Sequence, residues 1–168
     1  DEVAYGHKNT SFSEAFPEPA GHVSVIKYSV KAVYNGVITD PVFSNKVMLG
    51  YIAPPLDENF ATVAAFESQF MEVDNNGDGK TWMYDDTKGT GAVSYRYHSD
   101  NNGDDYLVLP AMKLTKGKIY FFSFLAGATN EGNPERIAAY VGKAPTAEAL
   151  NIELVKPTVI EPPLMLVD

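Results

Sequence analysis

The sequence predicts an all-β fold, and three observations lead to that prediction. Short runs of alternating apolar and polar residues, rich in Val, Ile, Tyr and Phe, recur along the chain, and such runs are typical of β-strands. Turn-forming pairs such as Asn35-Gly36 and Pro54-Pro55 separate them. Helical spacing is convincing only at residues 62–70, which begin with Thr62, a candidate N-cap. Many short strands divided by turns favour a β-sandwich or jelly roll with one short helix.

The first fifty residues are expected to form a domain of their own. Alternation over residues 26–32 predicts a half-buried strand, and Asn35-Gly36 predicts a tight hairpin because both residues tolerate positive φ. A second strand is expected at residues 42–49. Because two consecutive prolines cannot sit in a central strand, residues 50–55 are interpreted as a linker that divides the chain into domains at 1–50 and 51–168.

The second domain is expected to alternate polar loops with strands. Loops rich in Asp, Asn and Gly occupy residues 74–80 and 99–105. The tail at residues 156–163 contains three prolines, which predicts extended or edge structure. The strands expected in this domain are residues 82–84, 93–97, 106–109, 119–125, 136–141 and 152–155.

Composition limits the classes of function. Hydrophobic residues make up 45% and charged residues 21% of 168 residues, so a folded core is expected. The net charge of −9 disfavours nucleic acid and anionic lipid surfaces as partners and favours cations. No apolar run approaches the ~20 residues that span a bilayer, so no membrane insertion is expected. The absence of cysteine excludes disulfides, zinc–thiolate sites and thiol nucleophiles.

The first domain resembles the end of a fibronectin type III domain. The residues that carry this resemblance are Tyr-Ser-Val-Lys-Ala-Val-Tyr-Asn-Gly at 28–36, then Asp40-Pro41 and Ser-Asn-Lys-Val at 44–47. They are similar to the last two strands of that family. The resemblance implies that residues 1–50 contribute the C-terminal strands of a β-sandwich.

The second domain resembles the cleaved-adhesin or "choice-of-anchor J" domains found on secreted and surface proteins of Bacteroides-type bacteria. Several motifs carry the resemblance in order, at residues 58–60, 70–82, 104–110, 120–124, 135–136 and 141–146. It implies a calcium-stabilised jelly roll without catalytic activity, outside the cell or on its surface, that binds a host protein or glycan. It also implies further strands, so a companion fragment or a neighbouring copy is expected to complete the jelly roll.

The acidic loop at residues 74–80 is the first candidate metal site. Asp74, Asn76 and Asp78 place oxygen ligands at alternate positions, and Gly79 follows at the sixth, as in an EF-hand loop. Lys80 could add its backbone carbonyl. Calcium is the ion that such ligands favour, and the alternative interpretation is a solvated turn.

A second candidate metal site combines Glu58 with Asp104 and Asp105. Two adjacent carboxylates before an apolar strand are costly unless water or a cation neutralises them. The family resemblance suggests a structural calcium held by an early Glu and a later Asp. An acidic pair facing water is the alternative.

Three aromatic residues are candidates for ligand contact. Trp82 is the only tryptophan; exposed, it could stack on a sugar or a partner side chain, although the start of a strand favours packing in the core. Strand alternation places Tyr95 and Tyr97 on one side, which makes them candidates for an exposed aromatic platform. A buried sandwich face is the alternative for this pair.

A non-catalytic adhesin or binding module is therefore the expected function. No nucleophile elbow, phosphate-binding loop or zinc-ligand spacing is present, so an enzyme is not expected. A structural spacer in a larger surface protein is the alternative from a different class. A polysaccharide-degrading enzyme is a third hypothesis, since two carboxylates suffice for glycoside hydrolysis.

Overall fold

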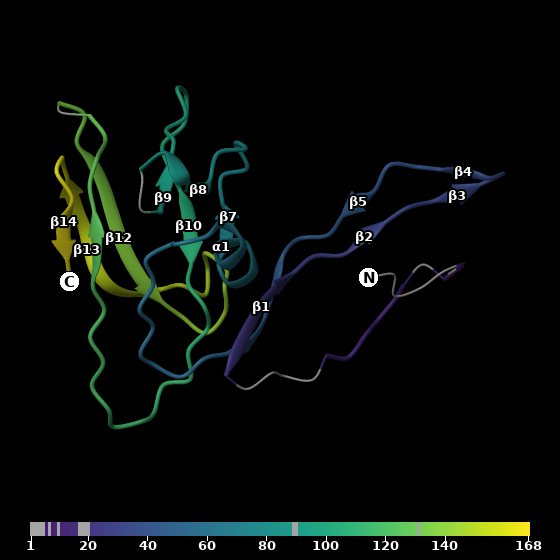
Figure 1. The fold of residues 1–168 in the computed structure, drawn as a ribbon, viewed down its shortest axis with the longest axis horizontal. Coiled ribbons are helices and arrows are strands. Elements are labelled where there is room, and N and C mark those ends of the chain that lie inside the picture. Colours follow the sequence, from purple (N-terminus) through teal and green to yellow (C-terminus); the bar gives the residue numbers. More distant parts are fainter. Residues whose placement is uncertain (1–5, 7, 10, 17–20, 89–90, 131) are drawn as a thin grey trace.

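The structure, a computed structural model, describes residues 6, 8–9, 11–16, 21–88, 91–130 and 132–168. The predicted all-β class is confirmed: the described strands form seven antiparallel two-stranded sheets (Figure 1). Three of these pairs join strands that follow one another in the chain, and the other four join strands with further strands between them. Among the described residues, no helix has the length and hydropathy needed to cross a bilayer.

A long two-stranded arm leads the chain into the body of the protein (Figure 1). Its tip is a hairpin in which Asn35 and Gly36 have φ values of 48° and 78°, so the predicted turn is confirmed, and positive φ at both positions is typical of a type I′ turn. From base to tip, the arm pairs β1 (His22–Ile26) with β6 (Val47–Tyr51), β2 (Ser29–Val30) with β5 (Val42–Phe43), and β3 (Val33–Tyr34) with β4 (Val37–Ile38).

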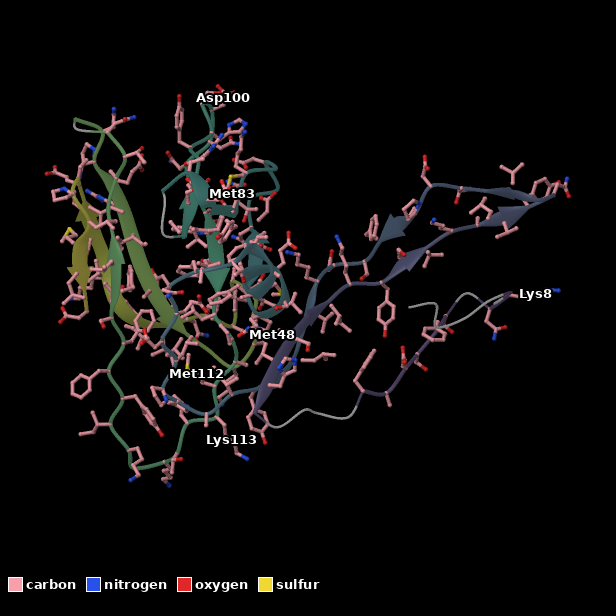
Figure 2. All side chains as sticks on the ribbon, in the orientation of Figure 1. Lys8, Met48, Met83, Asp100, Met112 and Lys113 are labelled. Atoms are coloured by element: carbon pink, nitrogen blue, oxygen red, sulfur yellow. The ribbon has the colours of Figure 1, made fainter. Side chains whose placement is uncertain are left out.

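The arm differs from the predicted half-buried strand at residues 26–32. β1 already ends at Ile26, β2 contains only two residues, and its Val30 side chain is exposed. Tyr34 at the tip is 77% exposed. Figure 2 shows side chains standing out from both faces of the outer arm into open space. Alternation was expected to mark one buried face. Tyr28 is covered by the rings of Phe12 and Phe16, whereas Val30 and the apolar residues nearer the tip are exposed.

The base of the arm joins the rest of the protein instead of ending at a linker. β6 continues through Gly50 and Tyr51, which pair with Val23 and His22. Ile52 then forms a parallel bridge to Met112. The expected linker at residues 50–55 therefore begins as a strand, and irregular chain containing Pro54-Pro55 follows it.

The predicted short helix is confirmed as α1 (Val63–Gln69). Thr62 is its N-cap, because the Thr62 hydroxyl accepts a hydrogen bond from the Ala65 backbone N–H at 3.2 Å. α1 packs against β1. Phe66 and Phe70 are buried and their rings stack with centroids 5.8 Å apart, so the helix supplies the core that joins the arm to the body.

The body consists of four strand pairs and a 3₁₀ helix, η1 (Asp86–Lys88). The pairs nearest the arm are β7 (Met71–Asp74) with β10 (Asp105–Val108), and β8 (Trp82–Asp85) with β9 (Ala92–Tyr95). The others are β11 (Phe124–Ala126) with β14 (Met165–Val167), and β12 (Glu135–Val141) with β13 (Ile152–Ile160).

A second core lies among the last four strands. Ala126, Val155, Ile160 and Val167 are its buried members. β13 extends to Ile160, so the first part of the proline-containing tail is extended as predicted. The strand expected at residues 119–125 is only partly formed, since β11 begins at Phe124 and Phe121 is 96% exposed. The reason is pairing: β14 offers this segment only three partner residues.

Candidate functional site

The two predicted polar loops meet at one end of the β7–β10 pair. Asp74 is the register partner of Asp105, so both loops leave the sheet from the same edge. The Asn75 side-chain amide donates to the Asp104 carboxylate at 2.7 Å, and the Asn101 amide donates to Asp78 at 3.2 Å. Figure 2 shows Asp100 at the outer tip of this end. We refer to residues 74–80 and 99–105 together as the polar loop pair.

The Asp74 carboxylate organises the first of these loops. It accepts hydrogen bonds from the backbone N–H groups of Gly77 at 2.7 Å, Asp78 at 3.2 Å and Gly79 at 2.9 Å. Gly77 and Gly79 have φ values of 72° and 78°, which a residue with a side chain adopts only at a cost. The two glycines therefore fold the chain around one carboxylate. The reversal at Gly79 agrees with the glycine at the sixth position of the sequence pattern, and calcium binding stays a prediction.

The environment of Asp78 favours the ionised form. The backbone N–H of Lys80 donates to Asp78 at 2.8 Å and is the main reason that the pKa of Asp78 is lowered. Burial is the second-largest effect and raises this pKa, while the side-chain amide of Asn101, the charge of His98 and the side-chain amide of Asn76 lower it by lesser amounts. The loop thus holds a stable anion near its outer side.

A hard cation at the first loop would need ligands in addition to its two carboxylates. Asp74 and Asp78 each accept three hydrogen bonds, and a carboxylate offers about four acceptor positions. Among the described residues, no three His, Cys, Asp or Glu side chains form a group that could hold a metal ion. A cation here would therefore need the Asn76 amide oxygen and the Lys80 carbonyl as well. Both groups are among the ligands that the sequence pattern predicts.

Glu58 does not join Asp104 and Asp105. Its carboxylate accepts a hydrogen bond from the Phe60 backbone N–H at 2.5 Å, on the irregular segment before α1. The three carboxylates do not form a metal-binding group within the described chain. The prediction that combined them is corrected: Asp104 and Asp105 belong to the polar loop pair, and Glu58 stabilises the turn at Phe60, which has a φ of 53°.

Trp82 connects the polar loop pair to the centre of the body. Its indole N–H donates to the Asp105 carbonyl oxygen at 3.2 Å, and its ring centroid lies 5.8 Å from that of Tyr95. The side chain is neither fully buried nor free. The contacts with Asp105 and Tyr95 hold the indole in place, and another part of the side chain lines a cleft. Trp82 therefore has features of both predicted alternatives, a packed core residue and an exposed ligand contact.

Tyr95 and Tyr97 do not form a common platform, which corrects the sequence prediction. β9 ends at Tyr95, so strand alternation does not extend to Tyr97, which is 77% exposed. The Tyr95 hydroxyl is buried without a hydrogen-bond partner, as is one oxygen of Asp105. Burial raises the pKa of Tyr95 to about 12, and nearby Asp105, Asp78 and Asp74 add to the rise. Asp105 is thus close enough to act on the hydroxyl without forming a well-oriented hydrogen bond with it.

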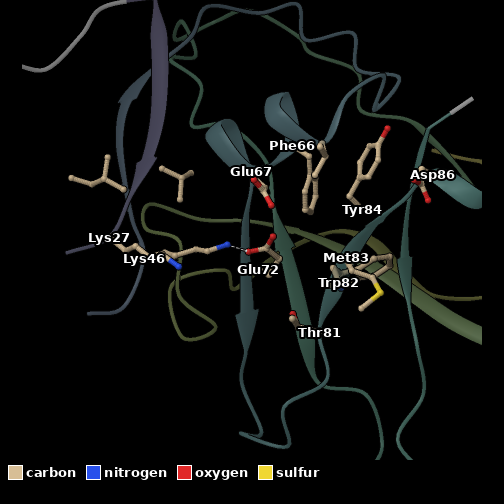
Figure 3. A pocket seen from close by; sticks show the side chains of 13 residues that line it. Lys27, Lys46, Phe66, Glu67, Glu72, Thr81, Trp82, Met83, Tyr84 and Asp86 are labelled. Atoms are coloured by element: carbon tan, nitrogen blue, oxygen red, sulfur yellow. Dashed lines mark hydrogen bonds and ion pairs between the residues drawn. The ribbon is translucent and has the colours of Figure 1, made fainter. Parts of the chain in front are cut away.

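A cleft of about 800 Å³ is lined by residues from the base of the arm, from α1 and from β8. Val25 and Ile26 of β1 line one wall, and the aromatic rings of Phe66, Trp82 and Tyr84 line the other. Figure 3 shows the Phe66 and Tyr84 rings side by side on this wall; their centroids are 6.3 Å apart.

An ion pair crosses the cleft. Lys46, which directly precedes β6, forms an ion pair with Glu72 of β7. Figure 3 shows Glu67 of α1 beside them. Sequence reasoning found Trp82 but missed the cleft, since its walls come from residues 25–27, 46, 63, 66–67, 72, 81–84 and 86. No local pattern brings such distant segments together.

Comparison of the chain with known protein families, with curated proteins and with solved structures found no match.

Proposed function

We propose that the chain is a non-catalytic binding module of a secreted or cell-surface protein, and that its partner, a host protein or a glycan, occupies the cleft between β1, α1 and β8. One observation carries the proposal. Trp82 is held by Asp105 and Tyr95 while it lines the cleft together with Phe66 and Tyr84. Aromatic side chains that are already fixed lose little conformational freedom on binding, and they contact sugars and apolar side chains equally well.

The size and composition of the cleft support the same function. A volume of about 800 Å³ lies within the range of ~300–1,000 Å³ for ligand sites. Apolar walls with a few charged groups are typical of sites that hold a ligand in one orientation. The jelly-roll and adhesin assignments that the sequence resemblance implies are part of this proposal.

Binding is tested with the only tryptophan of the chain as its reporter. A glycan array and a panel of host proteins are screened with the wild-type protein, and each hit is titrated while Trp82 fluorescence is followed. Trp82→Ala has lost the reporter, so its binding is measured on the array and the protein panel, where it should be abolished. Tyr34→Ala, on the exposed arm tip, should bind as the wild type does in both measurements. A protein that binds nothing in either screen would favour the alternative, a structural spacer, which the Lys46–Glu72 ion pair at the base of the arm would stiffen.

Calcium is the second part of the proposal. We infer that the polar loop pair holds a calcium ion through Asp74, Asn76, Asp78 and the Lys80 carbonyl, because these groups offer oxygen donors in a loop already folded around Asp74. An ion that binds only the folded state raises stability by about 2.7 kcal/mol at 100 times its Kd. For a chain of this length that corresponds to a rise in Tm of about 5–11 °C.

Thermal melting with calcium and with chelator tests this part. Asp78→Ala should remove the dependence on calcium. Glu153→Ala, which deletes an exposed carboxylate on β13 away from the loops, should keep it. A wild-type melting curve that is the same in calcium and in chelator would remove calcium from the proposal and leave ligand binding in the cleft untouched.

A further inference from the structure

The charges that line the cleft are not balanced. Lys46 is paired with Glu72. The Lys27 ammonium lies over the Phe43 ring, 4.7 Å from its centroid, and so is directed toward the arm. Glu67 and Asp86 also line the cleft, and within the described part of the chain neither has a hydrogen bond or ion pair. The charge left without a partner in the cleft is therefore negative.

Glu67 of α1 and Glu72 of β7 both line the cleft. In Figure 3 their carboxylates point toward one another, with the Lys46 ammonium at Glu72. Lys46 pairs with Glu72 alone, so the Glu67 carboxylate has no cation of its own among the described residues. Glu67 is exposed and lies next to the aromatic wall, so a cationic ligand can reach this carboxylate and the rings together.

The aromatic wall complements a cation as well. Phe66, Trp82 and Tyr84 present ring faces and edges to the same space. A guanidinium or ammonium over such a ring is attracted by its π-electrons. A neutral sugar could stack on the same rings but would leave Glu67 without a counter-charge, and an anionic ligand would meet two unpaired carboxylates in a chain of net charge −9.

From these observations we propose that the cleft takes a basic side chain, preferentially arginine, presented by a protein partner. This rests on the proposed function and narrows the partner from a protein or glycan to a protein. Arginine fits better than lysine, since its planar guanidinium stacks on aromatic rings and donates two parallel hydrogen bonds to a carboxylate. One side chain fills only part of 800 Å³, so the residues flanking the arginine lie in the cleft too, against Val25 and Ile26.

The experiment titrates the intact protein with three short peptides that differ in one central residue, Arg, Lys or Gln, and with a neutral oligosaccharide. Trp82 fluorescence reports occupancy in every case. The arginine peptide should give a saturable change, the lysine peptide a weaker one and the glutamine peptide none. Glu67→Gln should weaken arginine binding about tenfold or more, the factor expected for one charge-assisted hydrogen bond. Glu153→Gln, the matched change outside the cleft, should have no effect.

Each outcome separates this inference from the proposed function. Equal binding of the arginine and glutamine peptides, or wild-type affinity in Glu67→Gln, overturns the basic-ligand inference. A saturable Trp82 response to the oligosaccharide with none to arginine overturns it too, while the cleft remains a binding site. No response to any of the four ligands overturns it as well, and the broader screen with Trp82→Ala then decides whether the cleft binds anything.

Discussion

Replacing Tyr95 with phenylalanine tests how the polar loop pair is built. The Tyr95 hydroxyl is buried without a hydrogen-bond partner and lies near Asp105, which also has one unpaired buried oxygen. A buried polar group without a partner costs about 1–3 kcal/mol. Because Tyr95→Phe removes the unpaired hydroxyl and keeps the ring that contacts Trp82, we expect the free energy of unfolding to stay the same or to rise by about 1 kcal/mol, which is about 2–4 °C in Tm.

The same substitution changes the dependence of stability on pH in a defined direction. The pKa of Tyr95 rises from 10.0 to about 12 in the folded protein, mainly because of burial. Between these values the unfolded chain loses the Tyr95 proton while the folded chain keeps it. Wild-type stability therefore falls as pH rises from about 10 toward 12 and does not depend on this group below pH 10. Tyr95→Phe should show a shallower fall over that window.

Urea unfolding at neutral pH and across the alkaline range measures both effects. Tyr97→Phe is the matched control, since it removes the hydroxyl of an exposed tyrosine two residues away and should change neither quantity. Destabilisation of Tyr95→Phe by more than about 1 kcal/mol at neutral pH would refute the reasoning, because a loss of that size indicates a charge-assisted hydrogen bond to Asp105.

Three further substitutions test the core, the helix cap and the surface. Phe70→Ala should lower the free energy of unfolding by about 3–5 kcal/mol, because Phe70 is 1% exposed and stacks on Phe66; urea unfolding with a smaller loss would place the core elsewhere. Thr62→Ala should cost about 0.5–2 kcal/mol through loss of the cap on Ala65, and Thr62→Ser should restore most of it. Tyr97→Ala should stay within about 0.5 kcal/mol of wild type, and a larger loss would show that Tyr97 is buried in solution.

Local signals in the sequence predicted local structure well. Asn35-Gly36 predicted the hairpin at the arm tip, and Thr62 predicted the start of α1, because turn and cap geometry depend on a few neighbouring residues. The spacing from Asp74 to Gly79 predicted a tight turn with a glycine at its reversal, and Gly79 has a φ of 78°; calcium binding by that turn stays a prediction. In each case the energetic cause lies within five residues of the signal.

The sequence predictions that differ from the structure depended on contacts between distant segments. Alternation could not reveal that β9 ends at Tyr95, so Tyr97 leaves the face that Tyr95 shares with Trp82. The apolar run at residues 119–125 has the pattern of a strand, but a strand also needs a partner, and β14 pairs with only part of it. The cleft depends on β1 packing against α1, which no spacing in the sequence encodes.

The last prediction concerns assembly, because the described sheets are all two-stranded and leave strand edges open. Open edges and exposed apolar faces favour association with another chain. Such faces occur on the arm, with Val33 and Ile38, and on the outer strand pairs, with Leu154 and Leu166. We therefore expect the purified chain to self-associate, or to be found with a companion polypeptide that adds strands to the body.

Sedimentation combined with mass spectrometry measures the species present. Val33→Lys together with Ile38→Lys should reduce association if the arm is the contact, whereas Leu154→Lys with Leu166→Lys should reduce it if the outer strands are. Neither pair removes a buried side chain, so a change in mass reports on contacts between chains rather than on folding. A monomer of 18.3 kDa that unfolds cooperatively would contradict the prediction. Two-stranded sheets would then be sufficient for this fold, and its exposed apolar residues would need no partner.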